Sequence, residues 1–331
     1  MKITDLAVVF ILIVSPFFWI NSVHSHNRME AQQLSMRYTS ALRTAAQDGG
    51  SRLNENALQE YEPGYASTKF FRANKEKALD SMLRTLYMNF GIGDDRAAQM
   101  ALLTYIPAVV VIDYDGYYIY SFHSFQSSEG EELGDYRWTS KKPYAFSDQA
   151  GNIVHFTLDE HTTVYQASET KWLKGSRDQL YEEGSIPLLR DKDLFEAKRR
   201  TVIVQAIEED LARVMNSHNR YASRLGIDYT FTLPTISGEE WINTLNDIGL
   251  LVFLQGIPIG DQYYNNYGLG GGRLLKRPVI YGGTHPVNGL KYYYRDTCKQ
   301  EFKLEEVFTH EREAAAKGYY EARCPSQGKT K

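Results

Sequence analysis

The chain has 331 residues, 43% of them hydrophobic and 24% charged, and its formal net charge at pH 7 is -4. This composition is ordinary for a packed globular protein and excludes wholesale disorder, collagen and an isolated coiled coil. The near-neutral charge provides no overall attraction to nucleic acid, so we expect no nucleic-acid partner. Two cysteines exclude a disulfide-rich scaffold. A mean hydropathy of -0.44 excludes a protein with many membrane spans.

An uncharged run, LAVVFILIVSPFFWI, occupies residues 6–20. Its length lies between the apolar region of a signal peptide, about 7–15 residues, and a membrane-spanning helix of about 20. We expect residues 1–23 to be an uncleaved single-pass membrane anchor, with a cleaved signal peptide as the alternative. The overall pattern favours an extracytoplasmic body. The arginines that follow the run favour the opposite orientation by the positive-inside rule.

Residues 24–90 have the pattern of a helical stalk. Apolar side chains at residues 34, 38, 42 and 45 form one stripe and predict a helix from residue 27 to about 60. Gly49-Gly50 is expected to loosen or break this helix, since glycine weakens a helix by about 1 kcal/mol relative to alanine. A second helix is predicted over 73–89. A third is predicted over 94–105, with Asp94 as its N-cap.

Residues 91–331 are expected to form an α+β head with a mainly antiparallel sheet packed with helices. Its strongest hairpin signal has strands at 108–112 and 117–122 around the turn Tyr114-Asp115-Gly116. Further strands are predicted at 153–158, 162–165, 229–233, 250–255, 279–282 and 290–294. Helices are predicted at 192–225, from Ser237 onward and at 305–317.

The hairpin sequence Asp113-Tyr114-Asp115-Gly116, which follows a hydrophobic strand, resembles the first motif of haloacid-dehalogenase-like phosphotransferases. That resemblance implies a magnesium-dependent phosphatase with Asp113 as the nucleophile and Asp115 as the acid/base. The same segment is similar to the hairpin of PAS-like extracytoplasmic sensor domains, which implies ligand sensing. Turn formation alone also accounts for these residues, because aspartate and glycine favour turn conformations.

Other motifs give no positive indication of a cofactor, a metal or a catalytic residue, and we expect none. The run Gly268-Leu269-Gly270-Gly271-Gly272-Arg273 has the glycines of a phosphate-binding loop but lacks its Gly-Lys-Ser/Thr ending, so a flexible loop or close backbone packing is expected. The eight histidines do not show the spacings that place two metal ligands on one helical face. Cys298 and Cys324 are expected to form a disulfide if the head is extracytoplasmic.

The layout as a whole resembles pilins and the TadE-type pseudopilins of tight-adherence pili. The likeness rests on an apolar segment, then a helix with small residues over Tyr38 to Leu53 (YTSALRTAAQDGGSRL), then an α+β head. It implies a membrane-held structural or assembly component of a pilus or secretion apparatus that binds protein partners, with self-association as one possibility. We therefore expect a binding protein rather than an enzyme.

The chain contains 24 tyrosines against 15 phenylalanines. Consecutive strand residues face opposite sides of a sheet, so Tyr292, Tyr293 and Tyr294 cannot all be buried on the same face. Exposed tyrosine is enriched at protein interfaces. We therefore predict a partner surface on the head that includes Tyr263, Tyr264, Tyr267, Tyr292, Tyr293 and Tyr294.

Overall fold

The computed structural model describes residues 3–55, 65, 67, 72–126, 128, 132–183, 186–245, 247–272, 280–286, 288–295, 302–308 and 311–322, with residues 3–26 described as backbone only. The chain divides into two compact units, Met1–Leu274 and Leu275–Lys331. Both units combine helices with mainly antiparallel sheet, which confirms the predicted α+β class.

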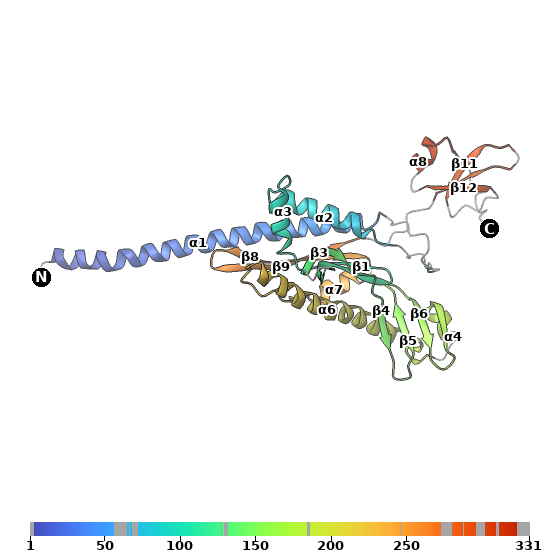
Figure 1. The fold of residues 1–331 in the computed structure, drawn as a ribbon, viewed down its shortest axis with the longest axis horizontal. Helices are drawn as coiled ribbons and strands as arrows, with labels where there is room; N and C mark the ends of the chain where they lie inside the picture. The colour runs from blue at the N-terminus through green and yellow to red at the C-terminus, as the bar shows by residue number, and fades with distance from the viewer. Residues whose placement is uncertain are drawn as a thin grey trace, which may run out of the picture. The chain divides into compact units, whose positions relative to one another are not determined.

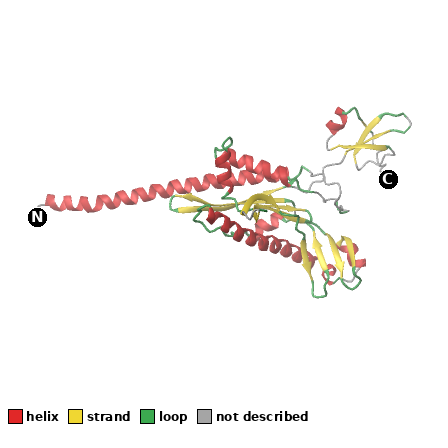
Figure 2. Ribbon diagram, viewed as in Figure 1, coloured by secondary structure: helices red, strands yellow, loops and turns green. Residues whose placement is uncertain are grey.

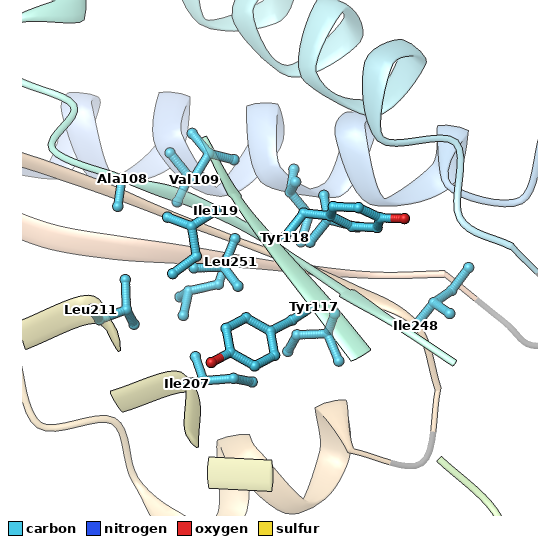
Figure 3. Close-up of a cluster of buried hydrophobic side chains, with 14 of the residues drawn as sticks. Ala108, Val109, Tyr117, Tyr118, Ile119, Ile207, Leu211, Ile248 and Leu251 are labelled. Atoms are coloured by element: carbon cyan, nitrogen blue, oxygen red, sulfur yellow. The ribbon is translucent and has the colours of Figure 1, made fainter. Parts of the chain in front are cut away.

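A five-stranded antiparallel sheet with the order β3-β2-β1-β8-β9 forms the centre of the first unit. Its strands are β1 (Val109–Asp113), β2 (Gly116–Gln126), β3 (Glu132–Trp138), β8 (Gly249–Ile259) and β9 (Gln262–Gly271). Every residue of β1 is buried, and so are the first eight residues of β8, because helices cover both faces of the sheet. Figure 3 shows this core, with Val109 and Tyr118 on one side of the sheet and Tyr117, Ile207 and Leu211 on the other.

The two faces of this sheet are covered by different helices (Figure 1). One face carries α1 (Ile3–Arg52) and α2 (Lys75–Asn89), which contact each other, and α1 also contacts β8 and β9. The other face carries α6 (Lys192–Arg224), which contacts β2. The shorter helices of this unit are α3 (Arg96–Leu103), α4 (Arg177–Glu183), α5 (Pro187–Arg190) and α7 (Gly238–Thr244).

A smaller antiparallel sheet extends from the same unit, as the strands in Figure 2 show. It has the order β4-β5-β6-β7, with β4 (Tyr144–Ser147), β5 (Ile153–Phe156), β6 (His161–Gln166) and β7 (Lys171–Ser176). The long helix α6 also contacts β4. The rings of Phe156 and Phe195, which lie 5.3 Å apart, join this sheet to α6, so one helix supports both sheets.

The predicted helical stalk differs from the structure in two ways. α1 ends at Arg52, not near residue 60, and Gly49-Gly50 remains helical because the two glycines lie directly against the sheet and α2. α1 and α2 also belong to the same compact unit as the sheet, whereas we expected a separate stalk ending at residue 90. Among the residues whose side chains the structure describes, no helix has the length and hydropathy needed to cross a membrane. The apolar run at 6–20 lies in the part of α1 described as backbone only.

Two local predictions in the first unit were wrong. The predicted strand at 229–233 has no strand pairing, because its backbone is hydrogen-bonded to side-chain amides instead. The N-cap of α3 is Asp95, not Asp94, since the Asp95 carboxylate accepts from the amide of Ala98 at 3.0 Å. The long helix and the hairpin were correctly predicted. In particular, Asp113 pairs with Gly116 across a two-residue turn.

The second unit contains a four-stranded sheet with the order β12-β10-β11-β13, in which only β11 and β13 pair in parallel among the described strands. Its elements are β10 (Ile280–Thr284), β11 (Lys291–Arg295), β12 (Lys303–Phe308), α8 (Glu311–Ala316) and β13 (Tyr320–Glu321). The predicted helix at 305–317 was wrong over its first part. Residues 303–308 pair with β10, and this pairing outweighs the helical preference of the sequence.

Candidate functional site

The glycine run at 268–272 is a site of close packing between β9 and α1. A Cβ atom at Gly270 would lie 1.8 Å from the carbonyl oxygen of Ala46, and one at Gly268 would lie 3.0 Å from that of Leu42. Alternate glycines of the strand therefore let the helix backbone approach the sheet directly. This confirms the packing interpretation. The run from 268 to 271 lies within β9, so it does not form the loop that a phosphate cradle requires.

A groove of about 460 Å³ lies between α1 and the end of the β8–β9 hairpin. Its polar lining includes Arg28, Gln32, Asp261, Gln262, Asn265 and Asn266. Two tyrosines of the predicted partner surface, Tyr263 and Tyr264, also line it. The groove thus offers charged, amide and aromatic groups where α1 leaves the sheet.

The tyrosines near this groove differ in exposure. Tyr263 is 46% exposed and is accessible to a partner. Tyr264 is 4% exposed, with its hydroxyl 3.1 Å from Thr39 Oγ1, and burial raises the pKa of its phenol. Tyr267 is half-buried and donates to Glu240 Oε2. Tyr264 and Tyr267 therefore hold β9 to its neighbours, and only Tyr263 has the exposure expected of a contact residue.

The second unit presents a cluster of aromatic side chains that we call the aromatic face. It consists of Tyr281, His285, Tyr292, Tyr294, Phe302 and Tyr320, all half-buried or exposed. Phe302 is central, since the ring centroids of Tyr292 and Tyr294 each lie 5.5 Å from its own. Tyr293 instead packs against the core that includes Phe308 and Tyr319.

The alternation predicted for residues 292–294 therefore explains how the aromatic face forms. Tyr292 and Tyr294 lie on one side of β11, and Tyr293 lies on the core side. Tyr281, Phe302 and Tyr320 were not part of the predicted partner surface. The strand alternation around Tyr281 and Tyr320 could have indicated that these rings belong to the surface. Their positions opposite Tyr294 and Tyr292, however, depend on long-range strand pairing.

The two aspartates of the hairpin form a buried cluster with a lysine. Lys141 Nζ lies 2.9 Å from Asp113 Oδ2 and also pairs with Asp115. The other oxygen of Asp113 accepts hydrogen bonds from the backbone amides of Ala73 and Tyr114, both at 2.9 Å. We call Asp113, Asp115 and Lys141 the carboxylate cluster. The hairpin motif contains the two acids of this cluster but not its base, because Lys141 is distant in sequence.

Burial and charge act in opposite directions within the carboxylate cluster. Burial raises the pKa of the Asp113 carboxyl, because an ionised group loses its hydration there. Burial also disfavours the Lys141 ammonium, but the attraction of Asp113 and Asp115 outweighs this and raises its pKa. The buried hydroxyl of Tyr144 donates to the carbonyls of Asp113, at 3.0 Å, and Gly116, at 2.7 Å, which fixes the turn beside the cluster.

Cys298 and Cys324, the predicted disulfide, lie outside the described residues. Among the side chains that the structure describes, no group of three His, Cys, Asp or Glu has the arrangement of a metal site. No family model, curated protein or solved structure matches the chain.

Proposed function

We propose that this protein is a membrane-anchored, extracytoplasmic assembly component of a pilus or secretion apparatus that acts by binding other proteins. The continuity of α1 carries this proposal. One uninterrupted helix starts at Ile3, includes the uncharged run at 6–20 and ends against the sheet at Arg52. A helix of 50 residues is about 75 Å long, enough for a membrane span and a docked segment in the same element.

The contact between α1 and the sheet supports the same role. Small residues of α1, including Ala45, Ala46 and Gly49, are buried where the helix meets β8 and β9. Because the two backbones approach so closely, the docked half of α1 cannot rotate without steric clash. An anchor joined to the sheet in this way would hold the first unit in a fixed orientation relative to the membrane.

The aromatic face supplies a surface suited to protein partners. Tyrosine combines a large apolar ring with a polar hydroxyl and few rotatable bonds, and it is enriched at interfaces. Tyr320 is 64% exposed at the edge strand β13, and Leu304 on β12 is 52% exposed. These side chains offer contact area on the second unit.

We do not propose phosphatase activity for the hairpin aspartates. Asp113 is 1% exposed, and both of its carboxylate oxygens already have partners. A nucleophile in phosphoryl transfer needs an oxygen that can reach phosphorus, whereas this carboxylate is enclosed by Lys141 and two backbone amides.

The membrane proposal is tested by fractionating cells that express the full chain. We expect it in the membrane fraction after carbonate washing, with an unprocessed N-terminus and a protease-sensitive body on intact cells. Ile13→Arg should release it, because arginine at the centre of a membrane helix costs about 2.5–3.5 kcal/mol. Ile13→Leu is the matched control and should remain bound. A wild-type chain that is trimmed and fully soluble would refute the anchor.

The assembly role is tested by cross-linking the full-length protein in its native membrane. We expect discrete higher-mass adducts that decrease in a Tyr292→Ser/Tyr294→Ser double variant. Tyr181→Ser is the control, since Tyr181 is 44% exposed on α4, in the other unit. Equal adduct yields in all three proteins would contradict a contact role for the aromatic face.

A further inference from the structure

The carboxylate cluster brings a lysine amine against a carboxyl group in a largely enclosed place. The side chains of Lys141, Asp113 and Asp115 are 18%, 2% and 20% exposed. The Nζ atom lies 2.9 Å from Asp113 Oδ2, which is bonded to the carboxyl carbon. When two reactive groups are already held this close, the reaction does not have to pay the entropy cost of bringing them together.

Two backbone amides point at the opposite oxygen of Asp113. The N–H groups of Ala73 and Tyr114 both donate to Oδ1, each at 2.9 Å. If the carboxyl carbon were attacked, negative charge would develop on this oxygen. Two preorganised donors are the arrangement that stabilises such an oxyanion.

Asp115 provides the proton transfer that the attack requires. It pairs with Lys141 Nζ and is therefore placed to accept the proton of the ammonium. Burial raises the pKa of Asp113, so that carboxyl keeps its proton at a higher pH than an ordinary aspartate. Transfer of the Lys141 ammonium proton to the adjacent Asp115 leaves a neutral amine beside two protonated carboxyl groups, which is the starting point of the attack.

We propose that Lys141 and Asp113 condense spontaneously to form an intramolecular isopeptide bond. Neutral Nζ attacks Cγ of protonated Asp113, and the oxyanion forms on Oδ1. Asp115 donates its proton to the Oδ2 hydroxyl and accepts one from the nitrogen. The Cγ–Oδ2 bond then breaks, water leaves and the amide remains. Asp115 ends protonated, as at the start of the attack, and no oxidant or co-reactant is consumed.

This bond would join the end of β1 to the segment between β3 and β4. Lys142, the next residue, already pairs with Tyr117 through two backbone hydrogen bonds of 2.9 and 3.0 Å. The isopeptide would make that junction covalent, between the central sheet and the chain entering the smaller sheet. The proposal is independent of the assembly role and would hold whether or not the protein lies in a membrane.

The test is the intact mass of the purified, denatured full-length protein. We expect the wild type to be lighter by one water molecule than its sequence requires. Lys141→Arg, Asp113→Ala and Asp115→Asn should each have the full mass of their sequence. Lys142→Arg is the matched control, because Lys142 also pairs with a buried aspartate, Asp210, and should still show the loss. A wild-type chain at full mass after prolonged incubation would overturn the proposal.

Two measurements distinguish this bond from other losses of water. A succinimide at Asp115-Gly116 would also remove water but would persist in Lys141→Arg, and that result would overturn the proposal. Tryptic digestion should yield a branched peptide from 97–137 and 138–171, with two N-termini and cleavage blocked at Lys141. Fragment ions must place the link on Asp113. A link on Asp115 would overturn the assignment.

Discussion

The side-chain amide of Asn219 on α6 forms both hydrogen bonds that a neighbouring strand would form with Phe231. Nδ2 donates to the Phe231 carbonyl at 2.9 Å, and Oδ1 accepts from its amide at 2.7 Å. Gln255 on β8 pairs in the same way with both backbone groups of Thr232, at 2.8 and 3.1 Å. The segment is thus held in place without belonging to a sheet, and Phe231 is buried against His218.

Replacing Asn219 tests this arrangement. Asn219→Ala should lower the free energy of unfolding by about 1–3 kcal/mol, because a buried donor and acceptor lose their partner. Asn216→Ala is the control, since Asn216 is exposed on the same helix and should change stability little. Denaturant unfolding measures the difference, and hydrogen exchange of the Phe231 amide should accelerate only in the first variant. Equal stability of the two variants would contradict the pairing.

The glycines of β9 provide a second pair of variants. Gly270→Ala should destabilise the protein by at least about 1–3 kcal/mol, because the new methyl group would overlap Ala46 and force α1 away from the sheet. At Gly271 a Cβ atom would meet nothing within 4 Å, so Gly271→Ala should be nearly neutral. Thermal unfolding of both variants measures the difference in their stability. Tolerance of alanine at 270 would show that the helix and strand are less closely packed than described.

His218 predicts an acid-dependent loss of stability. It is 1% exposed, and burial lowers the pKa of its imidazole from 6.5 to about 4. The unfolded chain therefore binds a proton near pH 6.5 and the folded chain does not. Stability is fully present above pH 6.5 and falls as the pH decreases towards 4, by about 3 kcal/mol at roughly 1.4 kcal/mol per pH unit.

The variant His218→Gln separates this effect from other acid-sensitive groups. Glutamine can still donate to the Thr104 carbonyl, which accepts from His218 Nε2 at 2.9 Å, but it does not titrate. The stability difference between wild type and variant should therefore shrink between pH 6.5 and 4, as measured by denaturant unfolding. A difference that stays constant with pH would contradict a neutral buried imidazole.

Substitution of adjacent tyrosines of β11 should lower stability by different amounts. Tyr293→Ala removes a ring from the second core and should cost about 2 kcal/mol or more. Tyr294→Ala removes a ring from the aromatic face, where an aromatic pair contributes about 0.5–1.5 kcal/mol. Hydrogen exchange of the amides in β10 to β12, measured in the full chain, should increase much more in the first variant. Equal increases would mean that β11 has no core side.

The local sequence pattern predicted an element correctly where residues within that element determine its structure. The α6 helix and the β1–β2 hairpin were predicted within a few residues, because periodicity and turn residues act over short distances. The prediction was wrong where residues distant in the sequence determine the local structure. Residues 303–308 form a strand because β10 lies beside them, and Phe231 lies outside any strand because Asn219 and Gln255 supply its segment's hydrogen bonds.

The same difference between local and long-range determinants applies to the carboxylate cluster and to the predicted partner tyrosines. Asp113 and Asp115 stand out in the sequence, yet the lysine that joins them lies beyond β3 and carries no local signal. The tyrosine content predicted exposed rings but not which ones. Alternation separated Tyr293 from its neighbours, whereas the burial of Tyr264 depends on α1 packing over β9, which no local pattern encodes.

The close contact between Ala46 and Gly270 has a mechanical consequence. A sliding step along α1 would bring side chains larger than the glycine gaps against β9, so the helix and strand must move together. Tension applied along α1 would pass directly into β9 and, through its hydrogen bonds, into β8 and β1 at the centre of the sheet. The pull would act as shear across paired strands, which loads many hydrogen bonds at once and avoids opening the sheet one bond at a time.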